Sequence, residues 1–240
     1  MPTDARETSC LYVREGDRVL LVDAGTGLRR IRTDRRLLDG VGRLDVVLTH
    51  FHLDHVVGLS YLPGLDVPVH VWAGGRLIAG ESSLELVHRL LDPPFLLSDA
   101  GDVAELVEVR ELEPPGTEIG PFRVDVRVQR KHPSPTLALR VNAVLAHCTD
   151  TAYDEENVEF ARGARVLLHE AFHAADTTDD DGHTASGEAG RLAAAAGVER
   201  LVLIHPGPMT TDEEALLSFA RRHFPATELG RDGMRIELDL

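Results

Sequence analysis

The sequence predicts an α/β protein made of stacked sheet and helix layers. Strand-like segments dominate the first half of the chain, where apolar residues alternate with polar ones or run on without interruption. In the second half, strand and helix patterns follow one another in turn, as in folds whose helices cover a sheet. A length of 240 residues suits one domain with a large core. We therefore expect a single domain over residues 1–240.

The individual elements follow from local patterns. Short runs rich in Val, Leu and Ile predict strands at 9–14, 18–23, 44–49, 67–72, 103–109, 122–129, 136–146, 165–169, 200–205 and 234–238. Helical periodicity predicts helices at 55–62, 76–91, 154–163, 187–197 and 212–223. Thr211 and Glu214 stand at capping-box spacing before the last helix. The acidic stretch at 176–187 predicts a loop before a helix.

Charge and composition disfavour several classes of partner. The formal net charge of −15 disfavours long-range attraction to nucleic acid or to an anionic membrane. Two cysteines, Cys10 and Cys148, are too few for a set of disulfides, and no C-x-x-C pair offers a thiolate zinc site. The N-terminal segment lacks a basic region followed by an apolar core, and no apolar run approaches the roughly 18 residues that span a bilayer. We expect a cytoplasmic protein with no membrane partner.

One short stretch carries most of the functional information. In VLTHFHLDHVVG, residues 47–58, three histidines and an aspartate follow a buried strand within six positions. Imidazole and carboxylate groups are the usual ligands of zinc and similar ions in the absence of thiolates. Side chains at i and i+2 of an extended segment point the same way, so His50 and His52 can bind one ion. The turn beyond them directs Asp54 and His55 toward a second ion. The alternative is a set of capping residues and surface histidines.

This pattern, H-x-H-x-D-H at the end of a strand, resembles the defining motif of the metallo-β-lactamase superfamily. That family has a four-layer αββα sandwich fold, and the resemblance covers nearly the whole chain. The preceding stretch RVLLVDAGTG resembles the strand and turn that come before the motif in the family. The resemblance implies that Asp23 orients the metal-bearing loop without binding metal itself.

Three later stretches resemble the ribonuclease Z-like branch of the superfamily, and each carries one residue at or beyond the end of a predicted strand. KHPSPTLALRV implies His132 as the third ligand of the first ion, VLAHCTDT implies Asp150 as a carboxylate that bridges both ions, and LVLIHPGP implies that His205 completes the second site. The chain departs from the branch at Cys148 and Thr149, where Ser and Gly are usual. The metal ligands expected in full are His50, His52, Asp54, His55, His132, Asp150 and His205.

Two other stretches bear on catalysis. LLHEAFH and DGHTASG resemble the H-E-A-T and H-s-t motifs of the same branch, which implies that Glu170 and His183 act as a pair near the leaving group. A histidine held by a carboxylate can protonate a departing oxygen. Asp54 is expected to orient or deprotonate the attacking water. The candidate catalytic residues are therefore Asp54, Glu170 and His183; the alternatives are a loop histidine and a buried strand-end glutamate.

These expectations together predict a hydrolase with two divalent metal ions, zinc first, with manganese or iron as alternatives. Iron-binding redox relatives usually carry glutamate where this chain has His52, which disfavours redox chemistry. The H-T-P-G-H-T motif of glyoxalase-like thioester hydrolases is absent. The preferred substrate is a small phosphodiester, because the negative charge disfavours RNA. Only 18 residues separate Asp150 from His169, where tRNA nucleases of the branch often carry a basic arm.

Three other functions stay open at this point. One is hydrolysis of a lactone or another ester, and a second is endonucleolytic processing of tRNA 3′ ends on the same fold. The third is a non-catalytic metal-binding or carrier protein, since ligands alone do not establish catalysis. The sequence is compatible with a homodimer, and it does not say whether the acidic loop at 176–181 covers the site.

Overall fold

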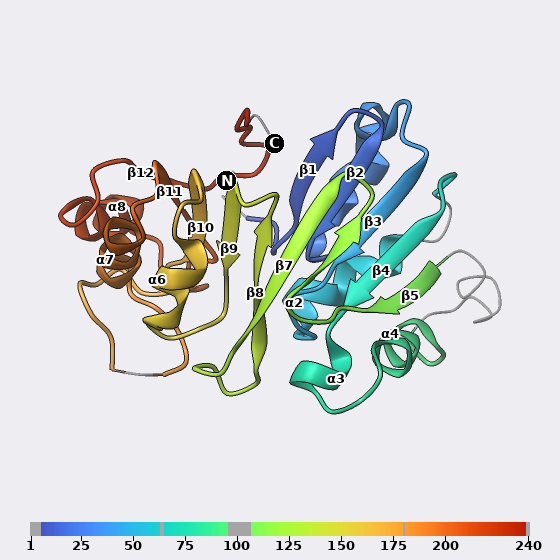
Figure 1. The fold of residues 1–240 in the computed structure, drawn as a ribbon, viewed down its shortest axis with the longest axis horizontal. Coiled ribbons are helices and arrows are strands. Elements are labelled where there is room, and N and C mark those ends of the chain that lie inside the picture. The colour runs from blue at the N-terminus through green and yellow to red at the C-terminus, as the bar shows by residue number, and fades with distance from the viewer. Residues whose placement is uncertain (1–5, 63–64, 96–106, 180, 239–240) are drawn as a thin grey trace. The chain divides into compact units, whose positions relative to one another are not determined.

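The computed structural model describes residues 6–62, 65–95, 107–179 and 181–238 of the chain. Two compact units are present (Figure 1). Unit 1 comprises Met1–Glu113 and Ile119–Pro121, and unit 2 comprises Pro114–Glu118 and Phe122–Leu240. Each unit has its own sheet and its own apolar core, so the predicted α/β class is confirmed. The single domain over residues 1–240 stays a prediction.

Unit 1 is built on a five-stranded sheet in the order β1-β2-β3-β4-β5. Only β1 and β2 are antiparallel. They are joined by a two-residue turn in which Gly16 has a φ of +60°, a conformation that such hairpins require and that glycine adopts without strain. The strands are β1 (Leu11–Glu15), β2 (Arg18–Val22), β3 (Arg43–Val47), β4 (Val69–Ala73) and β5 (Val107–Glu111).

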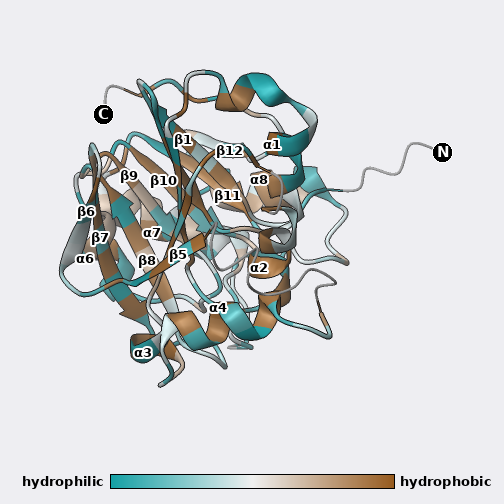
Figure 2. Ribbon diagram, turned by 90° about the vertical axis from the view of Figure 1, so that its right-hand side faces the viewer, coloured by the Kyte–Doolittle hydropathy of each residue, from teal (hydrophilic) through white to brown (hydrophobic). Residues whose placement is uncertain are grey.

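Helices and turns cover one face of this sheet. Alternate residues of the strands, such as Val19 and Leu21 on β2, point into a core that also contains Val56 and Leu59. Helix α4 buries Val87 and Leu91 and has both brown and teal segments in Figure 2, as expected for a helix with one buried face. The helical elements are η1 (Thr26–Leu28), α1 (Arg29–Thr33), η2 (Arg35–Leu38), α2 (Leu53–Val56), η3 (Val57–Tyr61), α3 (Gly75–Ile78) and α4 (Ser83–Leu91).

Unit 2 is built on a seven-stranded sheet in the order β12-β11-β10-β9-β8-β7-β6. The four strands from β12 to β9 are parallel, whereas β9, β8 and β7 pair antiparallel. The bounds are β6 (Gly116–Ile119), β7 (Phe122–Gln129), β8 (Thr136–Val141), β9 (Leu145–Cys148), β10 (Val166–Glu170), β11 (Arg200–Ile204) and β12 (Thr227–Leu229). Because β9, β10 and β11 are parallel, the residues that follow them emerge at one edge of the sheet.

Three helices pack against this second sheet: α6 (Glu156–Ala161), α7 (Ser186–Ala196) and α8 (Glu213–Arg221) (Figure 1). Their core is rich in alanine, which lets the helices approach closely. At Gly190 of α7, a Cβ atom would lie 2.4 Å from the carbonyl oxygen of Ala220 on α8, so any side chain there would separate the two helices. Close packing of α7 fixes the segment before it, which carries His183.

Several predicted elements differ in the structure. The predicted strand 136–146 is two strands, because Asn142 and Ala143 adopt positive φ and turn the chain between β8 and β9. The predicted helix 76–91 is interrupted before Ser82, which caps α4. Residues 234–238 form no strand, and β6, β12, η1, α1 and η2 were not predicted. The N-cap of α8 is Asp212, not Thr211. The part of the predicted strand 103–109 before residue 107 lies outside the described residues.

Within the described ranges, no helix has the length and apolar character needed to cross a bilayer. The cytoplasmic location stays a prediction.

Candidate functional site

The H-x-H-x-D-H segment gathers its histidines at the end of β3. His50 lies in the turn after the strand, and His52 is the N-cap of the short helix α2, which carries Asp54 and His55. The ring centre of His50 lies 4.5 Å from that of His52 and 4.2 Å from that of His55. Nε2 of His55 lies 3.4 Å from a carboxylate oxygen of Asp54. Unit 1 thus brings together the four residues of the motif.

Asp23 orients this segment from outside the predicted ligand set. It is fully buried, and one carboxylate oxygen accepts hydrogen bonds from the backbone N–H and the hydroxyl of Thr49, at 2.8 and 2.9 Å. The other oxygen lies 2.7 Å from Nδ1 of His55. A carboxylate on one ring nitrogen fixes the tautomer and raises the basicity of the other nitrogen. The contacts agree with the predicted orienting role of Asp23.

Two glycines allow the turn after β2 to lie against the motif. A Cβ atom on Gly58 would lie 2.1 Å from the carbonyl oxygen of Gly25, and one on Gly25 would lie 2.3 Å from the carbonyl oxygen of Asp54. The backbones also bond directly, because Gly58 N–H donates to Ala24 and Ala24 N–H donates to His55. Close approach of the two backbones therefore requires glycine at both positions.

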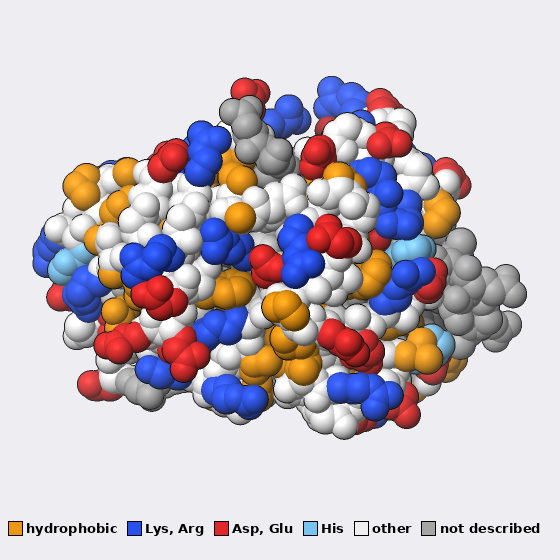
Figure 3. All heavy atoms as spheres, in the orientation of Figure 1, with side chains coloured by type: hydrophobic (Ala, Val, Ile, Leu, Met, Phe, Trp, Pro, Cys, Tyr) orange, Lys and Arg blue, Asp and Glu red, His pale blue; other side chains and the backbone are white. Residues whose placement is uncertain are grey.

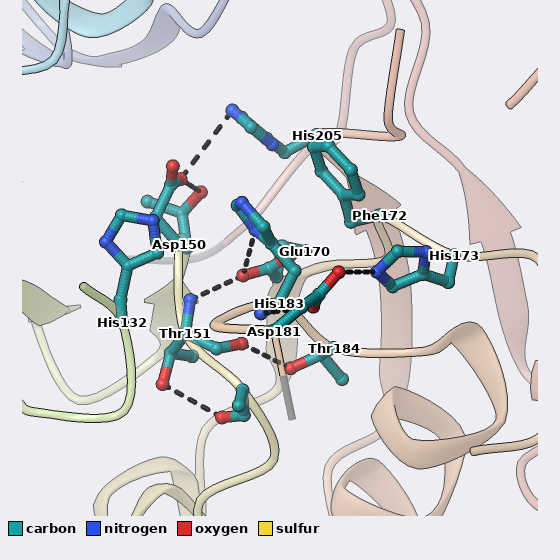
Figure 4. Close-up of polar contacts among 12 residues, drawn as sticks. His132, Asp150, Thr151, Glu170, Phe172, His173, Asp181, His183, Thr184 and His205 are labelled. Carbon is teal, nitrogen blue, oxygen red and sulfur yellow. Dashed lines mark hydrogen bonds and ion pairs between the residues drawn. The ribbon is translucent and has the colours of Figure 1, made fainter. Parts of the chain in front are cut away.

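In unit 2, the parallel strands bring three predicted residues to one edge. Asp150 follows β9, Glu170 ends β10 and His205 follows β11. Figure 4 shows Asp150 between His132 and His205. Nε2 of His205 lies 3.6 Å from a carboxylate oxygen of Asp150. One ligand atom each from Asp150, His183 and His205 lies within 4.8 Å of the others.

Asp150 is held firmly in a conformation that side chains rarely adopt. Its φ is +49°, in the left-handed region. The hydroxyl of Thr149 donates to its carboxylate at 2.6 Å, and the hydroxyl of Thr136 donates to its carbonyl oxygen at 3.1 Å. All three residues are buried. The Thr149 bond restrains the carboxylate, and the Thr136 bond restrains the backbone that carries it.

Glu170 and His183 form the predicted pair. Nδ1 of His183 lies 3.0 Å from a carboxylate oxygen of Glu170, and the backbone N–H of Thr151 donates to the other oxygen. Burial raises the pKa of Glu170 well above its usual value, and the nearby charge of Asp150 raises it further. Because Glu170 occupies Nδ1, Nε2 is the nitrogen of His183 that can act on a substrate.

Sequence reasoning missed two neighbours of His183, Asp181 and Phe172, which Figure 4 displays. A carboxylate oxygen of Asp181 accepts the backbone N–H of His183 at 3.1 Å, and its second oxygen lies 2.8 Å from Nε2 of His173. The ring of Phe172 stacks on the imidazole of His183 with 4.0 Å between centres. One signal was available: Phe172 stands where the resembling H-E-A-T motif has threonine. Nothing in the sequence marked Asp181, which lay in a stretch predicted to be a loop.

The donor atoms fit divalent metal ions. Zinc binds imidazole nitrogen and carboxylate oxygen at about 2.0–2.2 Å, so donors that share an ion lie roughly 3–4 Å apart. The Asp150, His183 and His205 atoms are near that spacing. This set includes His183, which the sequence placed outside both ligand sets. His132 also lies close, with its ring centre 5.1 Å from that of His183.

Comparison with known proteins decides the family. Residues 18–206, more than half of the chain, match the family model described as the Beta-lactamase superfamily domain. The chain belongs to this family. The solved metallo-beta-lactamase fold protein YhfI from Bacillus subtilis is 21% identical, with a TM-score of 0.75 over 95% of this chain and 90% of that one. The predicted metallo-β-lactamase fold, mixed α/β with two sheets, is therefore confirmed.

Two other proteins similar to this chain have names that state an activity. Ribonuclease Z of Methanothermobacter thermautotrophicus is 24% identical over 99% of this chain and 93% of its own length. A diphosphatase from the PhnP family is 17% identical, with a TM-score of 0.72 over 96% of this chain and 84% of that one. The prediction of a metal-dependent hydrolase is confirmed.

A buried histidine behind the site leads to a prediction about stability. His169 on β10 is fully buried, and burial lowers its pKa from 6.5 to about 4. The unfolded chain takes up this proton near pH 6.5 and the folded chain only near pH 4, so stability present above pH 6.5 is lost as the pH falls to 4. The expected loss is about 3 kcal/mol in the free energy of unfolding.

His169→Asn is the variant that tests this loss. Nδ1–H of His169 donates to the carbonyl oxygen of Glu170 at 2.8 Å. The side-chain amide of asparagine can make the same hydrogen bond, but asparagine does not titrate. Urea unfolding of metal-free protein at pH 7, 5.5 and 4.5 should show a steeper loss of stability for the wild type than for His169→Asn. Parallel curves for the two proteins would contradict the assignment.

Proposed function

We propose that this protein hydrolyses a small phosphodiester with two divalent metal ions, zinc first. The observation that carries the proposal is the buried Glu170 carboxylate on Nδ1 of His183, beside the donors Asp150 and His205. Such a pair delivers a proton to a leaving oxygen, and two ions suit a phosphoryl centre. The ligands in this proposal are those predicted from the sequence: His50, His52, Asp54, His55, His132, Asp150 and His205.

When bound, the ions activate a water and offset the charge of the phosphoryl oxygens. The residues of the chain perform the remaining tasks. Asp54 accepts a proton from the attacking water, which forms the new bond to phosphorus. The bond from phosphorus to the leaving oxygen breaks, and Nε2–H of His183 donates its proton to that oxygen. Glu170 keeps the imidazole in the tautomer and orientation that this donation needs.

The substrate is proposed to be small because several features disfavour RNA. Tight RNA binding depends on Lys and Arg groups that neutralise several phosphates, yet the net charge is −15. On the face in Figure 3, the basic side chains of described residues are interspersed with acidic ones. The ribonuclease Z alignment runs over 290 positions, whereas this chain has 240 residues, so that relative contains segments that this chain lacks.

The acidic loop is less repulsive to phosphate than its composition suggests. Asp176 lies 2.7 Å from Nε2 of His223 and 3.2 Å from the guanidinium of Arg191, and these contacts lower its pKa. Asp181 pairs with His173 at 2.8 Å. Two of the aspartates are therefore paired with positive or hydrogen-bonding groups, so they repel an anionic substrate less strongly than free carboxylates would.

A second candidate function is tRNA 3′ processing, which the likeness to ribonuclease Z favours. The two candidates are separated by kcat/KM of metal-loaded protein for an aryl phosphodiester, a panel of lactones and a tRNA precursor. We expect the phosphodiester to be the best substrate. Asp150→Ala protein, purified in the same way, identifies contaminating activity. Efficient cleavage of the precursor at its 3′ end, or turnover of lactones alone, would overturn the proposal.

A further inference from the structure

Phe172 lies flat against the imidazole of His183. The ring centres are 4.0 Å apart and the planes differ by 13°, which is close to parallel stacking (Figure 4). The same phenyl ring lies 6.1 Å from the ring of His205, at 26°. It therefore contacts the proposed proton donor. The ring of His205, a metal-ligand candidate, lies 6.1 Å from both the Phe172 and the His183 rings.

The segment after β11 holds Phe172 in place. Its carbonyl oxygen accepts the backbone N–H of Gly207 at 3.0 Å and the hydroxyl of Thr210 at 2.8 Å. A Cβ atom on Gly207 would lie 2.8 Å from Cε1 of Phe172, so only glycine leaves room for the ring in this position. The phenyl ring is thus clamped between this segment and His183.

The hydrogen bonds of His183 to Asp181 and Glu170 do not by themselves fix the tilt of its imidazole. Asp181 fixes the backbone of His183, and Glu170 fixes Nδ1. The contacts between Nδ1 and the two Glu170 carboxylate oxygens, at 3.3 and 3.0 Å, hold one edge of the imidazole, and a tilt of the ring about that edge would move Nε2. A flat aromatic surface 4.0 Å away opposes such a tilt, because stacked rings lose contact when their planes separate.

We infer that Phe172 is a positioning residue that aims Nε2 of His183 at the leaving oxygen. This inference rests on the proposed role of His183 as a proton donor. Proton donation matters most for a leaving group that is a poor anion, such as an alkoxide, and little for an activated aryl oxide. Phe172 therefore determines kcat for substrates with poor leaving groups, and Phe172→Leu should selectively lower kcat for these substrates.

The test compares kcat for two phosphodiesters that differ only in an alkyl or a nitrophenyl leaving group. For Phe172→Leu we expect kcat to fall about 10-fold with the alkyl leaving group and to stay within about twofold with the nitrophenyl one. The 10-fold loss is smaller than the full effect of removing a general acid, because His183 itself remains. Phe172→Tyr keeps the stack and should restore the alkyl activity. Phe219→Leu on α8, where Arg222 lies over the ring, is the matched control.

A second measurement does not depend on activity. In proton NMR, the imidazole protons of His183, assigned with His183→Ala, should show an upfield ring-current shift that Phe172→Leu removes and Phe172→Tyr keeps. Equal losses of kcat with both leaving groups, or no loss of the ring-current shift, would overturn the inference. If the wild type is inactive on both phosphodiesters, the proposed function is wrong. In that case kcat of the wild type and of Phe172→Leu on alkyl and aryl esters would test the role of Phe172.

Discussion

Asp150→Ala is expected to bring bound divalent metal well below one ion per chain and to reduce hydrolysis to background. Asp150 is the carboxylate proposed to bind both ions, and its donor atom lies near those of His183 and His205. Loss of a residue that only orients a ligand costs about 10–100-fold in metal affinity, and loss of a shared ligand should cost more. Metal analysis after incubation with zinc or manganese measures the effect, together with kcat/KM.

The control variants separate metal loss from misfolding. Alanine at φ +49° is strained, so Asp150→Asn is the companion, because asparagine tolerates this conformation and lacks the charge. Asp179→Ala removes an exposed aspartate of the acidic loop and should keep both ions. Two tightly bound ions in Asp150→Ala would contradict the proposed ligand set.

His183→Ala is expected to lower kcat by about 10²-fold or more and to leave the metal content unchanged. The reason is that His183 is proposed to donate a proton, and a positioned acid contributes at least about this much. Because one of its ring nitrogens also lies within 4.8 Å of donor atoms of Asp150 and His205, the metal content decides between two roles. Metal analysis and kcat measured on the same preparation provide the comparison.

Loss of metal in His183→Ala would show that His183 is a ligand, and unchanged turnover would show that it has no part in the reaction. His88→Ala on α4, outside both predicted residue sets, should behave as the wild type in both measurements.

The sequence predicted the elements whose signals are local. Strand β7 has the predicted bounds, because its alternation of buried and partly buried residues appears directly in the sequence. The turn between β8 and β9 was missed because Asn142 and Ala143 provide no glycine to mark their positive φ. Strand β12 was missed because it has only three residues and depends on pairing with β11.

The same contrast holds for the candidate site. The motif histidines lie close together in sequence, so a local pattern identified them. Asp150, Glu170 and His205 were identified by resemblance to the motifs of the ribonuclease Z-like branch, and each comes at a strand end. Whether they bind metal stays a prediction. Phe172 and Asp181 could not be identified as neighbours of His183, because their contacts depend on how the segments after β10 and β11 fold back. Such contacts arise from tertiary packing, which periodicity does not encode.

The positive φ angles of Asp23, Asp150 and His205 place these residues where the local backbone would prefer glycine. Each such residue costs roughly 1–2 kcal/mol relative to an ordinary conformation. Glycine or asparagine at these three positions would therefore relieve the backbone cost, but it would remove the side chains that the proposed function needs. In engineering this protein for heat resistance, these turns should stay fixed while stability is sought elsewhere.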